Sequence, residues 1–288
     1  MVTGADADAA LNFSRSEHWE TEKRYDWADE FVDVVRALWD SWEDDAIVAD
    51  PRSGVYVDES KVHPINHHGR HFHVAGPLNV ARPPQGQVVL LHAGTSDRSR
   101  ELGAREADVI FAAGGTIESA REYYGDVKER AGRYGRGPQE IHILPSLSVI
   151  VAETRREAVA IRDRLDGLLP VVADRPGVRQ GALGQATRPR QDWGITGDPV
   201  EVADYMQEWF ENGAADGFNL FPPFVPGSVQ AFTDLVVPEL QRRGLYRTEY
   251  AGSTFRHHLG LPRPRNRFEQ AGSRPEPEPH QLAVAAAD

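Results

Sequence analysis

The sequence predicts an α/β fold in which parallel strands alternate with helices, and it favours a (β/α)8 barrel that begins partway round. Short apolar runs at residues 87–92, 108–113 and 140–152 each precede a segment with helical spacing of apolar residues. Such alternation without hairpins is typical of parallel βαβ units. No GxGxxG motif follows the first full strand, which argues against a doubly wound dinucleotide fold. The chain supplies a strand stub and four full strands, whereas a complete barrel has eight.

The elements before the first full strand are a stub, a helix and an excursion. Residues 1–3 form the apolar stub, and residues 25–42 carry apolar side chains at spacings of three and four, which predicts a helix. The same spacing places Trp27, Phe31, Leu38 and Trp42 in the core. Residues 46–86 lose this period and contain short β-prone pieces, which predicts a hairpin insertion outside the barrel.

From residue 87 onward, strands and helices alternate. Strands are expected at 87–92, 108–113, 140–152 and 216–222, and Asp198 followed by Pro199 predicts the start of a helix. Residues 170–197 are rich in Gly, Pro and Arg and predict a mobile surface loop. The expected organisation is a barrel domain over 1–265 and a disordered tail over 266–288, which is rich in Pro and Glu.

Composition excludes several classes of function. Lys plus Arg is 32 and Asp plus Glu is 44, so the formal charge is 32 − 44 = −12, which argues against nucleic acid and anionic membranes as partners. The absence of cysteine excludes disulfides, thiolate metal sites and Cys nucleophiles. No apolar run approaches the ~20 residues of a membrane span, and the N-terminus has no signal-peptide pattern. We therefore expect a cytoplasmic protein.

The segment His92–Asp97 joins a predicted strand to a predicted helix and is the first candidate site. Gly94 allows close approach of a ligand to the backbone, and Thr95 and Ser96 lie where a helix N-terminus presents free amides. Such a terminus favours an anion, and phosphate is a common guest. The alternative is an ordinary helix cap, because every strand-to-helix turn needs one.

Five histidines within residues 63–73 form the second candidate site. They are His63, His67, His68, His71 and His73. Clustered imidazoles suggest a metal site. However, the surrounding sequence predicts a hairpin, on which His71 and His73 share a face, and no carboxylate falls inside the cluster. An exposed polar hairpin without metal is therefore preferred.

Several blocks of the chain resemble a known family. They are NFSRSEHWETEKRYDWADEFVDVVRALWDSWEDDA, KVHPINHHGRHFHVAGPLNVARPPQGQVVLLHAGTSDRSRELGAREADVIFAA and, near the C-terminus, DGFNLFPPFVPGSVQAFTDLVVPELQRRGLYRTEYAGSTFRHHLGLPRP. These blocks are similar to the luciferase-like flavin-dependent monooxygenases, in the branch of nitrilotriacetate monooxygenase, pristinamycin synthase and dibenzothiophene sulfone monooxygenase. The resemblance extends over almost the whole chain to residue 265.

The resemblance implies a (β/α)8 TIM barrel with an insertion and an enzyme of the oxidoreductase class. Such a flavoprotein uses reduced FMN and O2 to oxygenate a small organic substrate. A separate NAD(P)H-dependent flavin reductase would supply the reduced FMN in a two-component system, and a homo-oligomer is implied. The resemblance assigns the FMN phosphate to Tyr25 and the turn Ala93, Gly94, Thr95 and Ser96, and it places Thr3 near the flavin ring. It identifies no catalytic residue here and implies no metal.

The chain also departs from the family pattern. Full members are longer by about the first three βα units, and Met1 stands directly before the expected fourth strand. Gly4 occupies a position where relatives often carry a polar residue. Two interpretations therefore stay open at this point. One is an FMN-dependent monooxygenase, and the other is a catalytically inactive truncated barrel that acts as a binding or interaction module.

Overall fold

The computed structural model describes residues 1–4, 10, 12, 17–173 and 194–269. The chain divides into two compact units. The first contains residues 1–29 and 88–262, and the second contains residues 30–87 and 263–288. Helix α1 (Thr21–Trp39) runs from the first unit into the second. The predicted tail beyond residue 269 lies outside the described residues.

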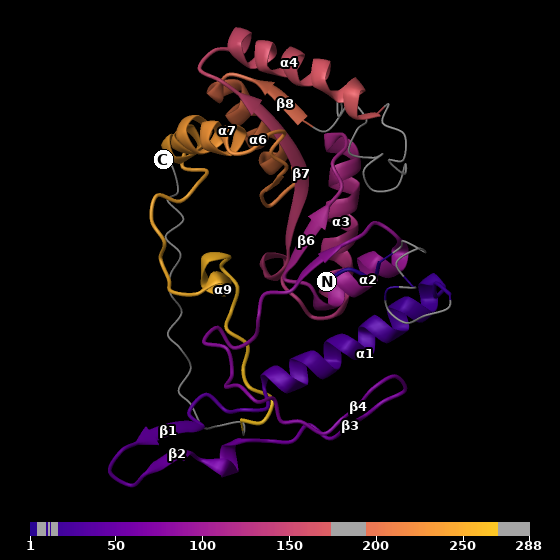
Figure 1. The fold of residues 1–288 in the computed structure, drawn as a ribbon, viewed down its shortest axis with the longest axis vertical. Coiled ribbons are helices and arrows are strands. Elements are labelled where there is room, and N and C mark those ends of the chain that lie inside the picture. Colours follow the sequence, from indigo (N-terminus) through magenta and orange to yellow (C-terminus); the bar gives the residue numbers. More distant parts are fainter. Residues whose placement is uncertain (5–9, 11, 13–16, 174–193, 270–288) are drawn as a thin grey trace. The chain divides into compact units, whose positions relative to one another are not determined.

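A parallel sheet of five strands forms the centre of the first unit. Its order is β5-β6-β7-β8, and β9 also pairs with β7. The strands are β5 (Leu91–Ala93), β6 (Val109–Ala112), β7 (His142–Val151), β8 (Gly194–Gly197) and β9 (Asn219–Leu220). Figure 1 shows β6, β7 and β8 side by side. The predicted parallel pairing of the four strand regions is confirmed, because β5–β6, β6–β7 and β7–β9 all pair in parallel.

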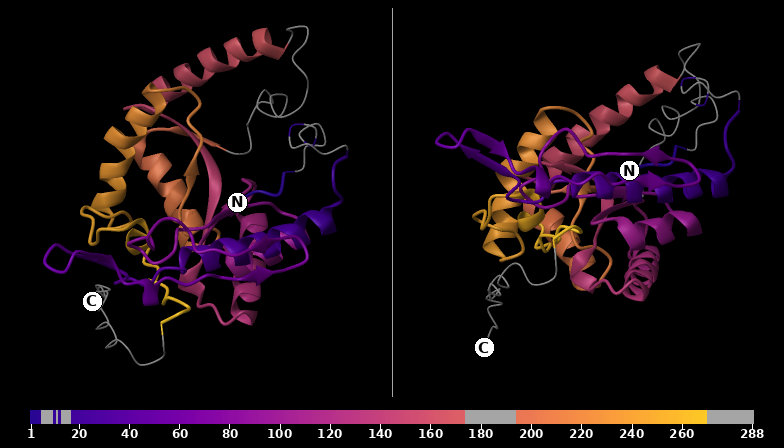
Figure 2. Two further views of the ribbon diagram at one scale, coloured as in Figure 1. Left: turned by 60° about the horizontal axis from the view of Figure 1, so that its bottom comes forward. Right: turned by 90° about the horizontal axis from the view of Figure 1, so that it is seen from below.

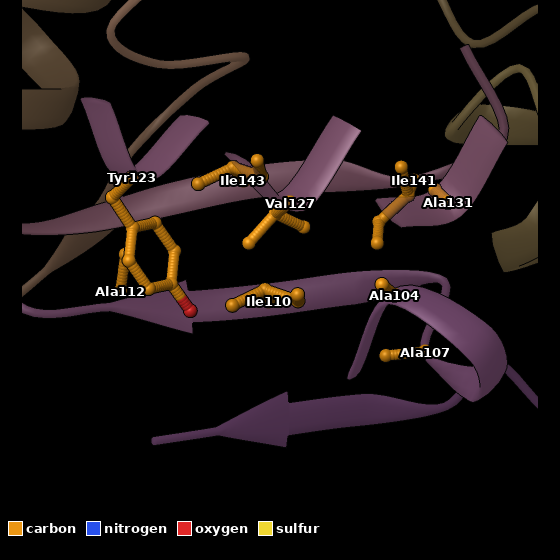
Figure 3. Packing of buried hydrophobic residues seen from close by; sticks show 9 residues of the cluster. All are labelled: Ala104, Ala107, Ile110, Ala112, Tyr123, Val127, Ala131, Ile141 and Ile143. Carbon is orange, nitrogen blue, oxygen red and sulfur yellow. The ribbon is translucent and has the colours of Figure 1, made fainter. Parts of the chain in front are cut away.

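Helices cover one face of this sheet. Along β7, buried side chains alternate with half-buried ones, and Ile143, Leu147 and Val149 belong to the buried set. Ile143 packs with Ile110 of β6 against α3 (Ile117–Arg133), as Figure 3 shows. On the other face, Val109 of β6 is 2% exposed, whereas its register partner Leu91 of β5 is 45% exposed.

Strand β8 was missed by the sequence analysis, which assigned residues 170–197 to a mobile loop. Ile195 and Thr196 pair in parallel with Val149 and Ile150 of β7. This short strand has a glycine at each end, so it contains no apolar run that could predict it. Helix α4 (Arg155–Ala173) precedes it, and residues 174–193 lie outside the described residues.

The remaining helices of the first unit follow their sequence signals. Asp198 caps α6 (Pro199–Glu211) by accepting from the amides of Val200 and Glu201, as predicted. Two further views show α6 and the α7 segment near β7 (Figure 2). The α7 helix (Gly227–Ala231) continues through a π-helical turn over Phe232–Val236 into α8 (Val237–Arg242). Pro238 cannot donate the usual backbone hydrogen bond, which explains the irregular turn before it.

The short helix α9 (Phe255–His258) fastens the C-terminal part of the first unit to the sheet. Arg256 makes two hydrogen bonds to Asp108, at 3.0 and 2.7 Å, and both side chains are more than 90% buried. Asp108 also accepts from the backbone amide of Leu90 at 2.8 Å. The start of β6 is thus tied to α9 by a buried bidentate ion pair.

The second unit contains two small antiparallel strand pairs. They are β1 (Ile47–Asp50) with β2 (Val55–Val57), and β3 (His67–His68) with β4 (His73–Val74). A short 3-10 turn (Glu59–Lys61) lies between them. These pairs fall within the predicted hairpin insertion of residues 46–86. Phe31, predicted as core, is 39% exposed and packs beside Phe72.

A polar network holds the second unit together. Arg82 donates from Nε to Asp40 at 2.9 Å and from Nη1 to Asp44 at 3.0 Å. Arg263 also binds Asp44, and Asn266 donates to the carbonyls of Asp40 and Trp42. Residues 266–269, the first part of the predicted disordered tail, therefore have defined contacts.

Within the described residues, none of the helices combines the length and the apolar character that crossing a membrane requires.

Candidate functional site

The six predicted site residues come from three segments of the first unit. Ala93 ends β5, Gly94 and Thr95 form the turn, and Ser96 caps α2 (Asp97–Glu106). Tyr25 lies on α1, and Thr3 lies in the N-terminal segment. That segment runs beside β5, since the backbone nitrogen of Met1 donates to the carbonyl of Leu91.

The turn at Gly94 requires glycine for two separate reasons. Its φ of +148° is a backbone conformation that side chains of L-residues rarely adopt. A Cβ atom at this position would lie 2.1 Å from the Oγ atom of Ser99 and 3.7 Å from the hydroxyl of Tyr25. The bare backbone therefore forms a close-packed cradle beside these two hydroxyl groups.

Tyr25 brings its hydroxyl to the start of α2. The residue is buried, and its hydroxyl makes hydrogen-bond contacts with the side chains of Ser99, Thr3 and Ser96. Burial raises the pKa of Tyr25, but these hydrogen bonds and the nearby charge of Arg24 outweigh that effect, so the net pKa is lowered. The structure thus brings Tyr25, Thr3, Gly94 and Ser96 together, although they lie up to 93 positions apart in the sequence.

Two residues of this cluster, Ser99 and Tyr123, were missed by the sequence analysis, whereas His92 lies at the start of the first candidate segment. His92 is 2% exposed, and its Nε2 lies 2.8 Å from the Oγ atom of Ser99. Its Nδ1 lies 3.2 Å from the carbonyl oxygen of Met1, an acceptor, so Nδ1 carries the proton. Burial lowers the pKa of His92 more than these hydrogen bonds raise it. Tyr123 of α3 donates to the carbonyl of Gly94 at 3.1 Å.

A cavity of about 190 Å³ adjoins the turn. It lies at the carboxyl ends of β5 and β6, near the starts of α2 and α3, and Thr95, Arg100, Ser119 and Tyr123 contribute to its lining. Arg100 is held in place, because it donates to the carbonyl of Thr95 at 3.0 Å and to Asp126 at 2.9 Å. The carboxyl ends of parallel strands are where barrels of this kind place their ligand sites.

The arrangement is suited to an anion. The first amides of α2 have no partner within the helix, and the helix dipole favours negative charge at this end. The Ser96 side chain accepts from the amide of Ser99 at 3.3 Å and so fixes the first turn. The Tyr25 hydroxyl adds a donor from a different helix. These features fit the phosphate group that the sequence analysis assigned to this turn.

The histidine cluster lies apart from these residues in the sequence and belongs to the second unit. His63 contacts Glu43 at 2.8 Å and His67 contacts Glu30 at 2.9 Å. His73 is paired with His68 across the hairpin. Over the described part of the chain, no group of three or more His, Asp or Glu side chains is placed to hold a metal.

Comparison with known proteins identifies relatives that match most of this chain. A family model described as luciferase-like monooxygenase matches residues 1–216. The chain is 38% identical to N-acetyl-S-(2-succino)cysteine monooxygenase of Bacillus subtilis, over 93% of this chain and 71% of that protein. It is 40% identical to nitrilotriacetate monooxygenase component A of Aminobacter aminovorans, over 92% of this chain and 69% of that protein.

Solved structures give the same result. The chain resembles the long-chain alkane monooxygenase LadA with a TM-score of 0.77 and 36% identity, over 88% of this chain and 64% of that chain. It resembles DmoA of Hyphomicrobium sulfonivorans with a TM-score of 0.76 and 31% identity, over 88% of this chain and 62% of that chain. Several relatives that match most of this chain are named as monooxygenases. These names favour an enzyme over an inactive interaction module.

Proposed function

The chain belongs to the luciferase-like monooxygenase family, and we propose that it binds reduced FMN and uses O2 to oxygenate a small organic substrate. The predicted fold class and the predicted enzyme class, an oxidoreductase that incorporates oxygen, are confirmed at the level of the family. The cofactor, the site residues and the substrate class belong to the proposal. The main observation that supports this proposal is that the Tyr25 hydroxyl lies beside the Gly94 turn.

In this proposal the phosphate of FMN lies against the start of α2. The backbone from Ala93 to Ser96 would bind it through amide groups, and the Tyr25 hydroxyl would donate to one of its oxygens. Thr3, whose side chain contacts the Tyr25 hydroxyl, would lie nearer the ring system. Bound reduced FMN would supply the electrons that activate O2. The protein would hold the cofactor, orient it and exclude water.

Replacing Ser96 by Asp tests the phosphate site. Asp is as good a helix cap as Ser, so the fold should be retained. A new carboxylate about 4 Å from a phosphate costs about 4 kcal/mol at an effective dielectric constant of 20. We expect the affinity for FMN, measured by isothermal titration calorimetry with the purified chain, to fall by at least 100-fold.

Two controls separate charge repulsion from general damage. Thr154 accepts from the amide of Glu157 at the start of α4, so Thr154→Asp places the same change on a different helix start and should leave FMN affinity unchanged. Riboflavin lacks the phosphate, so Ser96→Asp should weaken riboflavin binding far less than FMN binding. An equal loss of affinity for both ligands, or no loss of affinity for FMN, would contradict the assignment of the phosphate to this turn.

We also propose that a separate NAD(P)H-dependent flavin reductase supplies the reduced FMN, and that the chain forms a homo-oligomer. Two similar proteins carry names that mark them as one component of a monooxygenase and one subunit of a synthase, which supports a multi-component system. The test is NADH oxidation and O2 uptake in the presence of FMN. The chain alone should oxidise no NADH, whereas adding a flavin reductase should start turnover. NADH oxidation by the chain alone would contradict the two-component assignment.

A further inference from the structure

The β3–β4 hairpin of the second unit presents two histidines in a metal-binding geometry. We infer that His68 and His73 form a two-histidine site for a divalent transition-metal ion such as Cu²⁺, Ni²⁺ or Zn²⁺. The inference is independent of the proposed flavin site. It departs from the sequence-based preference for a hairpin without metal, and it rests on the distance between two ring nitrogens.

The two rings face each other across the strand pair. His68 and His73 are direct partners in the antiparallel register, and their side chains therefore leave the hairpin on the same face. Their Nδ1 atoms lie 3.4 Å apart, and the ring centroids lie 5.7 Å apart. Two imidazole nitrogens that bind one tetrahedral ion at about 2.05 Å each are about 3.3 Å apart. The observed spacing thus matches a chelating pair without rearrangement.

The backbone that carries the pair is clamped. Gly69 donates to the carbonyl of Phe72 at 2.9 Å and closes the turn. The carboxylate of Glu30 accepts from the amides of His71 and Phe72, each at 2.9 Å. A Cβ atom at Gly69 would lie 1.9 Å from a Glu30 oxygen, so this close approach needs glycine. Because the turn is held on both sides, little entropy would be lost when a metal joins the two rings.

The pair differs from the neighbouring histidines in its partners. His63 and His67 each contact a carboxylate, and the Nε2 of His71 is buried. His68 and His73 are exposed and contact each other. A metal could therefore reach their ring nitrogens without breaking an ion pair. Solvent or an external ligand would complete the coordination, since within the described chain no third protein ligand joins them.

The chemistry of the ligands defines the class of ion. Imidazole nitrogen suits Cu²⁺, Ni²⁺ and Zn²⁺, whereas Mg²⁺ and Ca²⁺ prefer oxygen ligands. For a given nitrogen site the affinity rises from Ni²⁺ to Cu²⁺ and falls again to Zn²⁺. We therefore expect Cu²⁺ to bind most tightly, at one equivalent per chain, and Mg²⁺ not to compete.

The test uses the full chain without an affinity tag. CuCl2, NiCl2 and ZnCl2 are titrated by calorimetry, and the Cu²⁺ complex is examined by electron paramagnetic resonance for coupling to two nitrogens. His68→Gln and His73→Gln should each weaken Cu²⁺ binding at least tenfold. The double variant should lose little more than either single variant, because a chelate is already broken when one ring is removed.

His63→Gln is the matched control. It removes an imidazole from the same unit, but one that contacts Glu43 and stacks on Phe268, so Cu²⁺ affinity should stay unchanged. Circular dichroism should show that His68→Gln and His73→Gln keep the fold, since both side chains are exposed, and it checks the fold of His63→Gln. Wild-type affinity in both single variants, or an equal loss in His63→Gln, would overturn the site.

Discussion

The two units of the chain bury different kinds of side chain. In the first unit, the cluster between the sheet and α3 is apolar, and Ile110, Val127 and Ile143 are each at most 1% exposed. In the second unit, the deeply buried side chains include Asp40 and Arg82, whose side chains are 3% and 1% exposed. Although the first unit also contains the buried Arg256–Asp108 pair, it is stabilised mainly by removal of apolar surface from water, and the second unit depends more on matched charges.

This difference determines how each unit responds to change. Apolar packing is lost gradually, in proportion to the volume removed. A buried charge network fails abruptly, because removal of one partner leaves the others charged and out of water. Burial alone would raise the pKa of Asp44, but Arg263 and Arg82 hold that pKa well below its usual range. The Asp44 carboxylate therefore stays ionised and depends on its arginines.

The largest expected effect is the loss of Arg82. Arg82→Met keeps the apolar stem and removes the guanidinium that binds Asp40 and Asp44. We expect the free energy of unfolding of the second unit to fall by about 3–5 kcal/mol. Urea unfolding, followed by hydrogen exchange of peptides from residues 30–87, measures this change separately from the first unit.

Two variants sharpen that result. Arg52 is exposed, so Arg52→Met removes a charge from the same unit and should change stability by less than about 0.5 kcal/mol. Adding Asp40→Leu to Arg82→Met should recover part of the loss, since an apolar pair can replace a buried ion pair. If Arg82→Met is as mild as Arg52→Met, the second unit does not depend on its charge network.

The second prediction concerns the apolar unit. Ile110 is fully buried in the cluster drawn in Figure 3. Ile110→Ala should lower the free energy of unfolding of the first unit by about 2–5 kcal/mol, through lost burial and the cavity that remains. Ile110→Val is the graded control, with an expected loss of about 0.5–1.5 kcal/mol. A flat response across the two variants would show that this cluster does not set the stability of the unit.

The same contrast explains which parts of the fold could be predicted from the sequence. The apolar runs at 108–113 and 140–152 predict β6 and β7, because a buried strand appears in the sequence as a short run of apolar residues. Strand β8 has no such run and was missed. The pairing of Arg82 with Asp40 could not be predicted, because 42 positions separate two residue types that are common on surfaces.

The candidate site was predicted only in part. The turn at Gly94 has a local signal, whereas the presence of Tyr25 there came from the family resemblance and not from spacing. Ser99 and His92 lie within seven positions of each other, but their contact at 2.8 Å depends on how α2 packs on β5. A polar residue inside a predicted buried strand, such as His92, is the one signal that could have pointed to this contact.

The smallest expected effect is confined to the hairpin at Glu30. Burial raises the pKa of Glu30, but hydrogen bonds from His67 and from the amides of His71 and Phe72 outweigh it and lower the pKa to about 2. A carboxylate with a lowered pKa binds fewer protons when folded than when unfolded. Its stabilising contribution is therefore present above the ordinary pKa of about 4.5 and is lost as the pH falls toward about 2.

Glu30→Gln tests this contribution, because Gln cannot ionise. At pH 6 the amides of His71 and Phe72 should exchange with deuterium faster in Glu30→Gln than in the wild type, while those of β1 and β2 should be unchanged. For the amides of His71 and Phe72, the exchange rate in Glu30→Gln is divided by the rate in the wild type at each pH. This ratio cancels the intrinsic effect of pH on exchange. That ratio should shrink toward one between pH 4.5 and pH 3, as the wild-type carboxylate begins to gain its proton. A ratio that stays constant with pH would mean that the charge of Glu30 does not hold the hairpin.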